Sequence, residues 1–297
     1  MLDDTAEALF PTQRQVGANP LLAVDVANGA PYAPLPRSVL VVPQMLEVCS
    51  GLATDDELER ITSLRRDFNI GDYQTPYVKD IARAFRLLKN CKTYLEIGTF
   101  DRGNLAYVAS LLDDDALIIG LDVVDEPTRD ALLRSKLRPG QTYIPILGNS
   151  RTEDAYARVK EILGDRALDA VFIDGDHTAY GVMSDYARYE GLVGDSGVVL
   201  FHDSVWEGTP EHKGSADALC EIDKLDPVYL VDGDTPPRRF IRPMFRNEFW
   251  GVVGVVFASE QLWRNRTLHG PEGCNGVGNG TFASKVFKEL KRWFRPG

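Results

Sequence analysis

Short apolar runs, each ending in polar residues, recur through the middle of the chain. They predict buried strands near residues 93–97, 117–122, 143–147, 170–173, 198–201 and 252–257. Helical spacing and helix-start signals predict helices near residues 55–68, 76–90, 104–112, 151–163, 178–192 and 215–225. A capping box at Ser150–Glu153 is expected to open the fourth of these helices, and a turn is expected at Gly194–Gly197. Strands that alternate with helices imply an α/β fold with a mostly parallel sheet covered on both faces.

The turn after the first strand carries the most informative motif, Glu96-Ile97-Gly98-Thr99-Phe100-Asp101-Arg102-Gly103-Asn104. A phosphate-binding P-loop would need Lys and Ser or Thr after its second glycine, where this chain has Asn104-Leu105. A dinucleotide fingerprint would need a third-position glycine, where this chain has Phe100. Both nucleotide-phosphate motifs are therefore excluded. An acid before Gly98 and exposed backbone amides after it suit a cationic, nucleoside-like ligand.

Polar groups also follow the later strands. Asp122 ends the second strand, 24 residues after Gly98, at a place where doubly wound folds bind ribose hydroxyls. Gly148-Asn149-Ser150 follows the third strand, Asp174-Gly175-Asp176-His177 the fourth, and His202-Asp203-Ser204 the fifth. Open α/β sheets bind ligands beyond the carboxyl ends of their strands, so we expect these groups to share one site.

In this order the motifs resemble the class I S-adenosylmethionine-dependent O-methyltransferases, most closely the metal-dependent small-molecule and sugar enzymes. The resemblance covers about residues 76–258 and implies a doubly wound, mostly parallel, seven-stranded sheet whose last strand is antiparallel. The chain is then expected to consist of an amino-terminal arm with a helical extension (1–74), the S-adenosylmethionine-binding domain (75–260) and a tail with an amphipathic helix (261–297). The arm could also clasp a second copy in a homo-oligomer.

The resemblance implies which residues bind the cofactor. Glu96 is expected beside its amino-acid end, Asp122 at its ribose hydroxyls, and Asn149 with Ser150 at its adenine edge. The alternative is that Glu96 only caps a turn and that Asp122 is a solvated strand end. The expected cofactor-binding residues are Glu96, Gly98, Thr99, Phe100, Asn104, Asp122, Asn149, Ser150 and Asp174. The family often has glycine in place of Arg102, whose side chain could crowd the methionine part of the cofactor or redirect the turn.

A second group resembles the family's catalytic residues. Asp174 and Asp203 end neighbouring strands and form the expected site for a divalent ion such as Mg or Mn, with a third ligand from His202 or, on the other side of Asp203, Ser204. A histidine ligand could also shift the metal preference or signal loss of the metal, or His202 could simply line the site. His177, assigned with Asp174 to catalysis, is expected to accept the proton of the acceptor hydroxyl. The alternative for His177 is a cap on the helix that follows it.

The composition of the chain limits the classes of partner and site that can be expected. A formal net charge of −11 argues against a nucleic-acid backbone as the main partner. The four cysteines are widely spaced, so neither a zinc site nor a disulfide framework is expected. The first residues lack the signal-peptide pattern and no apolar run is long enough to span a bilayer, so a cytoplasmic location is expected. A cluster of arginines at 238–246 could hold an anionic acceptor or pair with surface acids.

The expected function is methyl transfer from S-adenosylmethionine to a hydroxyl of a small molecule, with metal assistance and with a sugar or glycosylated metabolite as acceptor. One alternative is a metal-independent methyltransferase that acts on another nucleophile. A non-catalytic, cofactor-binding subunit is a further alternative. An NAD-dependent oxidoreductase is disfavoured by the missing glycine pattern.

Overall fold

A computed structural model describes residues 44–68, 78–209, 212–232, 236–240 and 253–258. The chain divides into two units, Met1–Leu35 and Pro36–Gly297, and every described residue belongs to the second. The predicted arm, the helix start at Thr75-Pro76, Arg242, Arg246 and the tail helix lie outside the described residues. Within the described part of the chain, no helix is long and apolar enough to cross a membrane.

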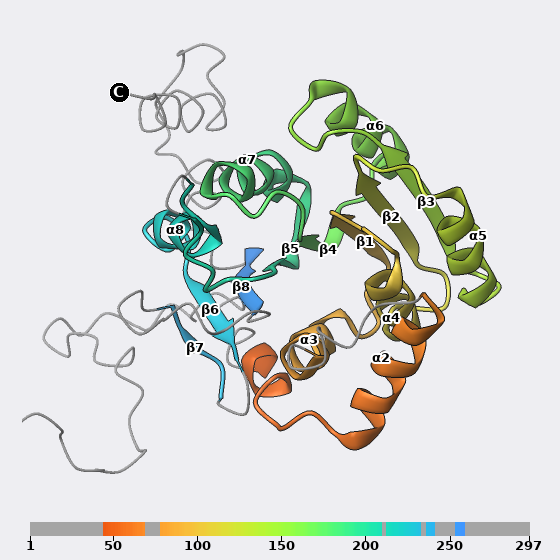
Figure 1. Cartoon of the computed structure of the whole chain (residues 1–297), viewed down its shortest axis with the longest axis horizontal. Helices are drawn as coiled ribbons and strands as arrows, with labels where there is room; N and C mark the ends of the chain where they lie inside the picture. The colour runs from red at the N-terminus through yellow and green to blue at the C-terminus, as the bar shows by residue number, and fades with distance from the viewer. Residues whose placement is uncertain (1–43, 69–77, 210–211, 233–235, 241–252, 259–297) are drawn as a thin grey trace, which may run out of the picture. The chain divides into compact units, whose positions relative to one another are not determined.

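The described strands form one eight-stranded sheet in the order β3-β2-β1-β4-β5-β8-β6-β7 (Figure 1). Their bounds are β1 (Thr93–Ile97), β2 (Leu117–Asp122), β3 (Thr142–Leu147), β4 (Leu168–Ile173), β5 (Val193–Phe201), β6 (Val228–Val231), β7 (Arg238–Arg239) and β8 (Val253–Phe257). The strands β1 to β5 pair in parallel, and β8 lies antiparallel between β5 and β6. The predicted fold class is confirmed, with the two-residue β7 as a strand beyond the expected seven.

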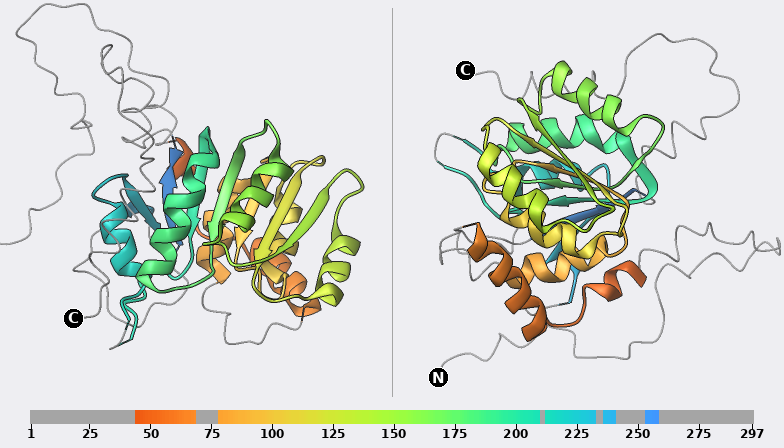
Figure 2. Two further views of the ribbon diagram at one scale, coloured as in Figure 1. Left: turned by 90° about the horizontal axis from the view of Figure 1, so that it is seen from above. Right: turned by 90° about the vertical axis from the view of Figure 1, so that its right-hand side faces the viewer.

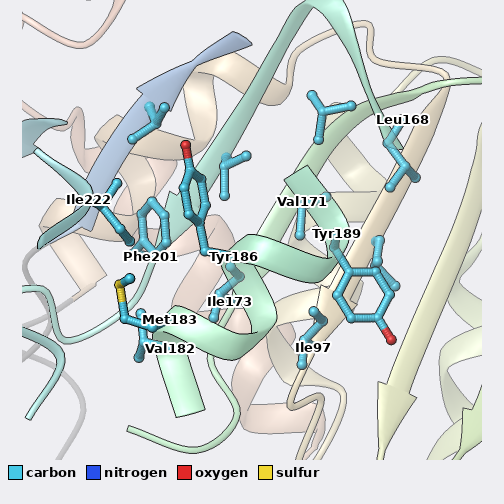
Figure 3. Close-up of a cluster of buried hydrophobic side chains, with 14 of the residues drawn as sticks. Ile97, Leu168, Val171, Ile173, Val182, Met183, Tyr186, Tyr189, Phe201 and Ile222 are labelled. Carbon is cyan, nitrogen blue, oxygen red and sulfur yellow. The ribbon is translucent and has the colours of Figure 1, made fainter. Parts of the chain in front are cut away.

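Helices cover both faces of the sheet, as the two turned views show (Figure 2). One core cluster packs α6 (Glu153–Leu163), α7 (Ala179–Tyr189) and α8 (Ser215–Ile222) against the sheet. The opposite cluster packs α2 (Asp55–Asp67), α3 (Val78–Ala84), the 3-10 helix η3 (Phe85–Leu88), α4 (Gly103–Leu111) and α5 (Pro127–Lys136). Figure 3 shows Met183 and Tyr186 of α7 beside Phe201 of β5. Burial on both faces explains why the strands are continuous apolar runs in the sequence.

Local hydrogen bonds explain where several helices begin. At α2 the predicted helix is confirmed, and Thr54 and Glu57 cap it reciprocally. The capping box expected at Ser150 is wrong, because Thr152 is the residue that caps α6, with its hydroxyl accepting from the Ala155 amide at 3.3 Å. Backbone and hydroxyl bonds from Thr152 to the Asn149 carbonyl form a turn there instead.

Other elements also differ from expectation. The turn predicted at Gly194–Gly197 lies within β5, which begins at Val193 after the short 3-10 helix η4 (Glu190–Leu192). Neither α5 nor β6 was predicted. The helix α2, assigned to an extension, buries Ile61 in the same core cluster as α4, and Phe68 at its end is buried there too. The expected domain limits at 75 and 260 stay predictions.

We expect Phe172→Ala to lower the free energy of unfolding by about 3–5 kcal/mol, because it opens a cavity in the central strand. Phe172 is fully buried in β4, and its ring meets Phe85 edge-on with 5.0 Å between centroids. Urea denaturation would measure the change. Leu52→Ala is the matched control, since Leu52 is 61% exposed, and its cost should stay within about 0.5 kcal/mol. Equal effects of the two substitutions would contradict this view of the core.

Candidate functional site

A cavity of about 790 Å³ lies beyond the carboxyl ends of β1 to β5. Strand ends, the loops after them, α4 and α2 contribute its lining: Arg65, Ile97, Gly98, Phe100, Asn104, Leu121, Asp122, Val123, Gly148, Asn149, Ser150, Arg151, Asp174, Gly175, Asp176, His177, His202 and Asp203. The structure therefore brings together the polar groups that follow all five parallel strands. This is the edge of the sheet at which open α/β folds bind ligands.

The first wall of the cavity depends on Gly98. Its φ is +84°, and a Cβ atom built on it would come within 2.2 Å of the Asp174 carbonyl oxygen. No side chain can occupy such a position, so the turn after β1 needs glycine to pack against the end of β4. The close approach places the first turn directly beside Asp174.

Asp122 lines the cavity and also holds the loops around it. One of its carboxylate oxygens, Oδ2, accepts from the backbone amides of Thr99 and Phe100, both at 2.7 Å. The other oxygen, Oδ1, accepts from the Val124 amide at 2.9 Å. A carboxylate oxygen has two lone pairs, so Oδ1 keeps one for a further hydrogen bond. Asp122 therefore orders the loops beside the cavity with three backbone hydrogen bonds.

Two of the expected cofactor-binding residues do not line the cavity. Glu96 is buried with 1% exposure, and its carboxyl accepts from the Tyr94 hydroxyl at 2.7 Å. Burial raises the pKa of Glu96 to about 8, against the opposing effect of the Tyr94 hydrogen bond. Thr99 is also buried, and its hydroxyl lies 3.2 Å from Asp122 Oδ2. Glu96 is thus bonded within its own strand, and Thr99 joins the turn to Asp122.

Asn104 and Arg102 have contrasting positions. The Oδ1 atom of Asn104 is buried without a hydrogen-bond partner among the described residues, and Asn104 lines the cavity. The side chain of Arg102 is only 3% exposed and is not part of the lining. Its φ of +69° is one that glycine favours. The side chain of Arg102 therefore does not crowd the cavity, and its backbone keeps a conformation that glycine permits.

Two histidines and two aspartates form a cluster at the ends of β4 and β5, in which each histidine lies near both aspartates. His177 Nδ1 lies 3.2 Å from Asp203 Oδ2, and its Nε2 lies 3.5 Å from Asp174 Oδ1. His202 Nδ1 lies 2.8 Å from Asp174 Oδ1, without the geometry of a hydrogen bond, and 3.4 Å from Asp203 Oδ1. The four residues singled out in the sequence are therefore in mutual contact.

The two carboxylates raise the pKa of both imidazoles. For His202, burial lowers the pKa, but the adjacent Asp174 carboxylate and the charge of Asp203 more than offset it and raise the pKa to about 9. For His177, burial likewise lowers the pKa, and the Asp203 hydrogen bond with the charges of both aspartates raises it above its usual value. The two carboxylates thus favour the protonated form of both neighbouring imidazoles.

The same group has a donor set that fits a divalent ion. Ligand atoms of Asp174, His177 and His202 lie within 4.8 Å of one another. Sequence analysis expected Asp203 in place of His177, and both side chains lie at this cluster. Mixed nitrogen and oxygen donors suit Mn, Fe or Zn better than Mg, which prefers oxygen.

Several lining residues were missed in the sequence. Arg65 comes from the end of α2, and no motif links it to the strand ends. Arg151 follows Ser150, and its guanidinium pairs with Asp176 at 2.7 Å, which joins the loops after β3 and β4. The place of Arg151 in the sequence, directly after Ser150 at the expected adenine edge, could have indicated that it lies at the site. Of the arginine cluster, Arg238 pairs with Asp232 and Arg239 with Asp223.

Comparisons with known proteins concern the family and the fold. Residues 95–204 match the model of a family described as methyltransferase domain, and no curated protein matches the chain. One similar solved structure is the MycE methyltransferase of the mycinamycin biosynthetic pathway with Mg, SAH and mycinamycin VI, at 20% identity and a TM-score of 0.45, covering 74% of this chain and 57% of that one. This chain thus spans little more than half of MycE.

Two further solved structures are O-methyltransferases. TomG from Streptomyces achromogenes, in complex with SAM, is 13% identical with a TM-score of 0.43, covering 74% of this chain and 95% of that one. The O-methyltransferase from Bacillus cereus, in complex with SAH, is 14% identical with a TM-score of 0.44, covering 69% and 91%. At these TM-scores the structural likenesses carry no argument about function.

The raised pKa of His202 gives a pH dependence that can be measured. The folded protein holds this proton to a pKa of about 9, against 6.5 for an ordinary histidine, so the stability it contributes is complete below 6.5 and is lost as the pH rises through 9. In excess chelator, the free energy of unfolding should therefore fall between these pH values, and His202→Gln should flatten the fall. His212→Gln, at an exposed histidine, is the control. Parallel slopes for the wild type and His202→Gln would refute the shift.

Proposed function

We propose that the chain transfers a methyl group from S-adenosylmethionine to a hydroxyl of a small molecule, and the match of residues 95–204 to a methyltransferase domain family supports this proposal. This proposal is carried by one observation: the Asp122 loop, Asp174, His177 and Asp203 line the same cavity. The Asp122 loop can hold a nucleoside, and the other three residues can orient and deprotonate an acceptor. A binding module without turnover would not need a histidine placed between two carboxylates.

The cavity fits this cofactor by its polar and apolar groups. S-Adenosylmethionine supplies a methyl group made electrophilic by its sulfonium. The partnerless Asn104 Oδ1 can accept from an ammonium group, and Asp122 Oδ1 can accept from a ribose hydroxyl. Phe100 and Val123 line the cavity although they are 68% and 67% exposed, which leaves apolar surface for an adenosyl group to cover.

His177 is the proposed general base. Its side chain is 35% exposed, so an acceptor can reach it, and Asp203 fixes its orientation through Nδ1 at 3.2 Å. A base must first be neutral, whereas the two carboxylates favour its protonated form. A divalent cation held by Asp174 and His202, with Asp203 beside them, would polarise the acceptor hydroxyl. By offsetting the carboxylate charges it would also lower the pKa of His177 toward neutrality.

The acceptor class we propose is a sugar or glycosylated metabolite. Trp206 supports a ring-bearing acceptor, because its indole stands edge-on to the His177 imidazole with 6.1 Å between centroids. Hydrogen bonds from the Trp206 amide to the Asp203 carbonyl and from the Ala216 amide to the Trp206 carbonyl fix its backbone. An aromatic face beside the base can pack against a sugar ring while its hydroxyl meets His177.

Cofactor binding is tested by calorimetric titration with S-adenosylhomocysteine. Asp122→Ala should weaken binding by about 2–4 kcal/mol, because it removes a charge-assisted acceptor for the ribose and releases the loop amides. Asp125→Ala removes the same charge from an exposed residue of the same loop and should leave affinity unchanged. Binding of NAD, with none of S-adenosylhomocysteine, would overturn the proposed function.

A second test, with an accepted hydroxyl substrate, distinguishes the contribution of the metal to turnover from that of the base. Asp203→Asn and excess chelator should each abolish turnover, with Mg or Mn restoring only the chelated wild type. His177→Ala should reduce kcat by about 10²–10⁴ while the cofactor still binds, and higher pH should recover part of the rate. His212→Ala is the control. Undiminished turnover in chelator would remove the metal and favour the metal-independent alternative.

A further inference from the structure

Arg102 occupies a backbone conformation that an arginine disfavours. It precedes α4 with φ +69° and ψ 5°, in the left-handed region, and its side chain offers no cap to the helix. Only glycine adopts this region without steric cost. A residue kept there against its preference indicates that the side chain makes compensating interactions.

Those interactions are made beneath the cavity. The guanidinium donates to the carbonyl of Phe100 through Nη1 and to the carbonyl of Val124 through Nη2 at 3.4 Å. Its Nε donates to Asp130 Oδ1 at 2.9 Å, and the Tyr143 hydroxyl donates to the same oxygen at 2.9 Å. Both Arg102 and Asp130 are nearly fully buried, at 3% and 5% exposure. The planar fork of an arginine can meet all three acceptors at once.

The two residues held by Arg102 are also held by Asp122. Phe100 gives its amide to Asp122 and its carbonyl to Arg102. Val124 does the same, with its amide on Asp122 Oδ1 at 2.9 Å and its carbonyl facing Arg102. The loop after β1 and the loop after β2 are therefore joined twice, once through an anion and once through a cation. These two charged side chains lie 3.9 Å apart.

Packing cannot replace this polar clamp, which consists of Asp122, Arg102 and the backbone of Phe100 and Val124. The side chains of Phe100, Val123 and Val124 are 68%, 67% and 49% exposed, so the apolar core does not anchor them. Yet Phe100 and Val123 line the cavity on the side of Asp122. The shape of this wall depends on hydrogen bonds to backbone groups. Arg102 donates the bonds that the backbone carbonyls accept, and Asp122 accepts those that the backbone amides donate.

We propose that Arg102 is a positioning residue that presets the nucleoside wall of the cavity, so that the cofactor binds to loops already ordered. The inference rests on the proposed function for its ligand and adds a residue that does not touch that ligand. A preset wall lowers the conformational entropy lost on binding, which raises affinity without a new contact. The chain thus uses a buried cation at a place where glycine would give the turn alone.

The decisive variant is the double substitution Arg102→Gly with Asp130→Asn. Glycine keeps the backbone conformation, and asparagine keeps an acceptor for Tyr143 while leaving no unpaired buried charge. Binding of S-adenosylhomocysteine, measured by calorimetry, should weaken about tenfold, and kcat at saturating cofactor should change far less. Wild-type affinity in this variant would overturn the inference, because Arg102 would then serve only to neutralise Asp130.

Arg102→Lys provides the second arm. Lysine keeps the charge beside Asp130 but lacks the fork that reaches both carbonyls, so affinity should again be about tenfold weaker. Full affinity with lysine would reduce the role of Arg102 to charge. Hydrogen exchange of the Phe100 and Val124 amides in the cofactor-free proteins tests the clamp directly, and exchange should be faster in both variants.

The two proposals fail in different ways. A wild type that binds no S-adenosylhomocysteine overturns the proposed function, and the exchange rates then decide the positioning role alone. Unchanged exchange at Phe100 and Val124 in both variants overturns the inference even where the cofactor binds. Circular dichroism of each variant before titration establishes that the fold is retained.

Discussion

The site depends on how closely β1 approaches β4. These two strands pair in parallel in the middle of the sheet, and the turn after β1 then passes so near Asp174 that only glycine fits at residue 98. The Asp174 amide donates to the Ile97 carbonyl at 2.8 Å, which continues the strand pairing into the loops. Because of this contact, the Asp122 wall of the cavity and the His–Asp group belong to one edge of the sheet. Neither could be displaced without breaking the central pairing.

Each aspartate at the cavity lies near a basic side chain. Asp176 faces Arg151, Asp122 lies near Arg102, and Asp174 and Asp203 are flanked by two histidines. A cationic cofactor would therefore meet oriented acceptors and apolar surface instead of a free excess of negative charge. Such an arrangement costs less to bury than isolated carboxylates, whose desolvation would otherwise raise their pKa values. Glu96 shows that effect, since burial raises its pKa to about 8.

Much of the sheet could be predicted because parallel strands buried on both faces leave continuous apolar runs in the sequence. The strand ends were also predictable, since Asp122, Asp174 and Asp203 follow such runs directly. The position of Glu96 outside the cavity lining has a physical cause in strand alternation. Leu95 and Ile97 pack in one core cluster and Tyr94 in the opposite one, so Glu96 shares the Tyr94 side and points into the helix layer.

Long-range partners explain most of what the sequence could not show. Arg65 lies on α2, more than thirty positions before the first glycine turn, and only tertiary packing brings it to the cavity. Likewise α5 carries little helical periodicity beyond Leu132 and Leu133, yet it supplies Asp130 to Arg102.

Arg102 itself illustrates the limit of motif comparison. If only the motif is considered, an arginine at the position where the family often has glycine suggests an altered contact with the ligand. In the fold, the left-handed backbone turns the side chain away from the cavity, toward two carbonyls and a buried aspartate. The backbone conformation that glycine permits is retained, and the side chain adds hydrogen bonds that glycine cannot make. A departure from the motif thus changes how the loop is held and leaves its course intact.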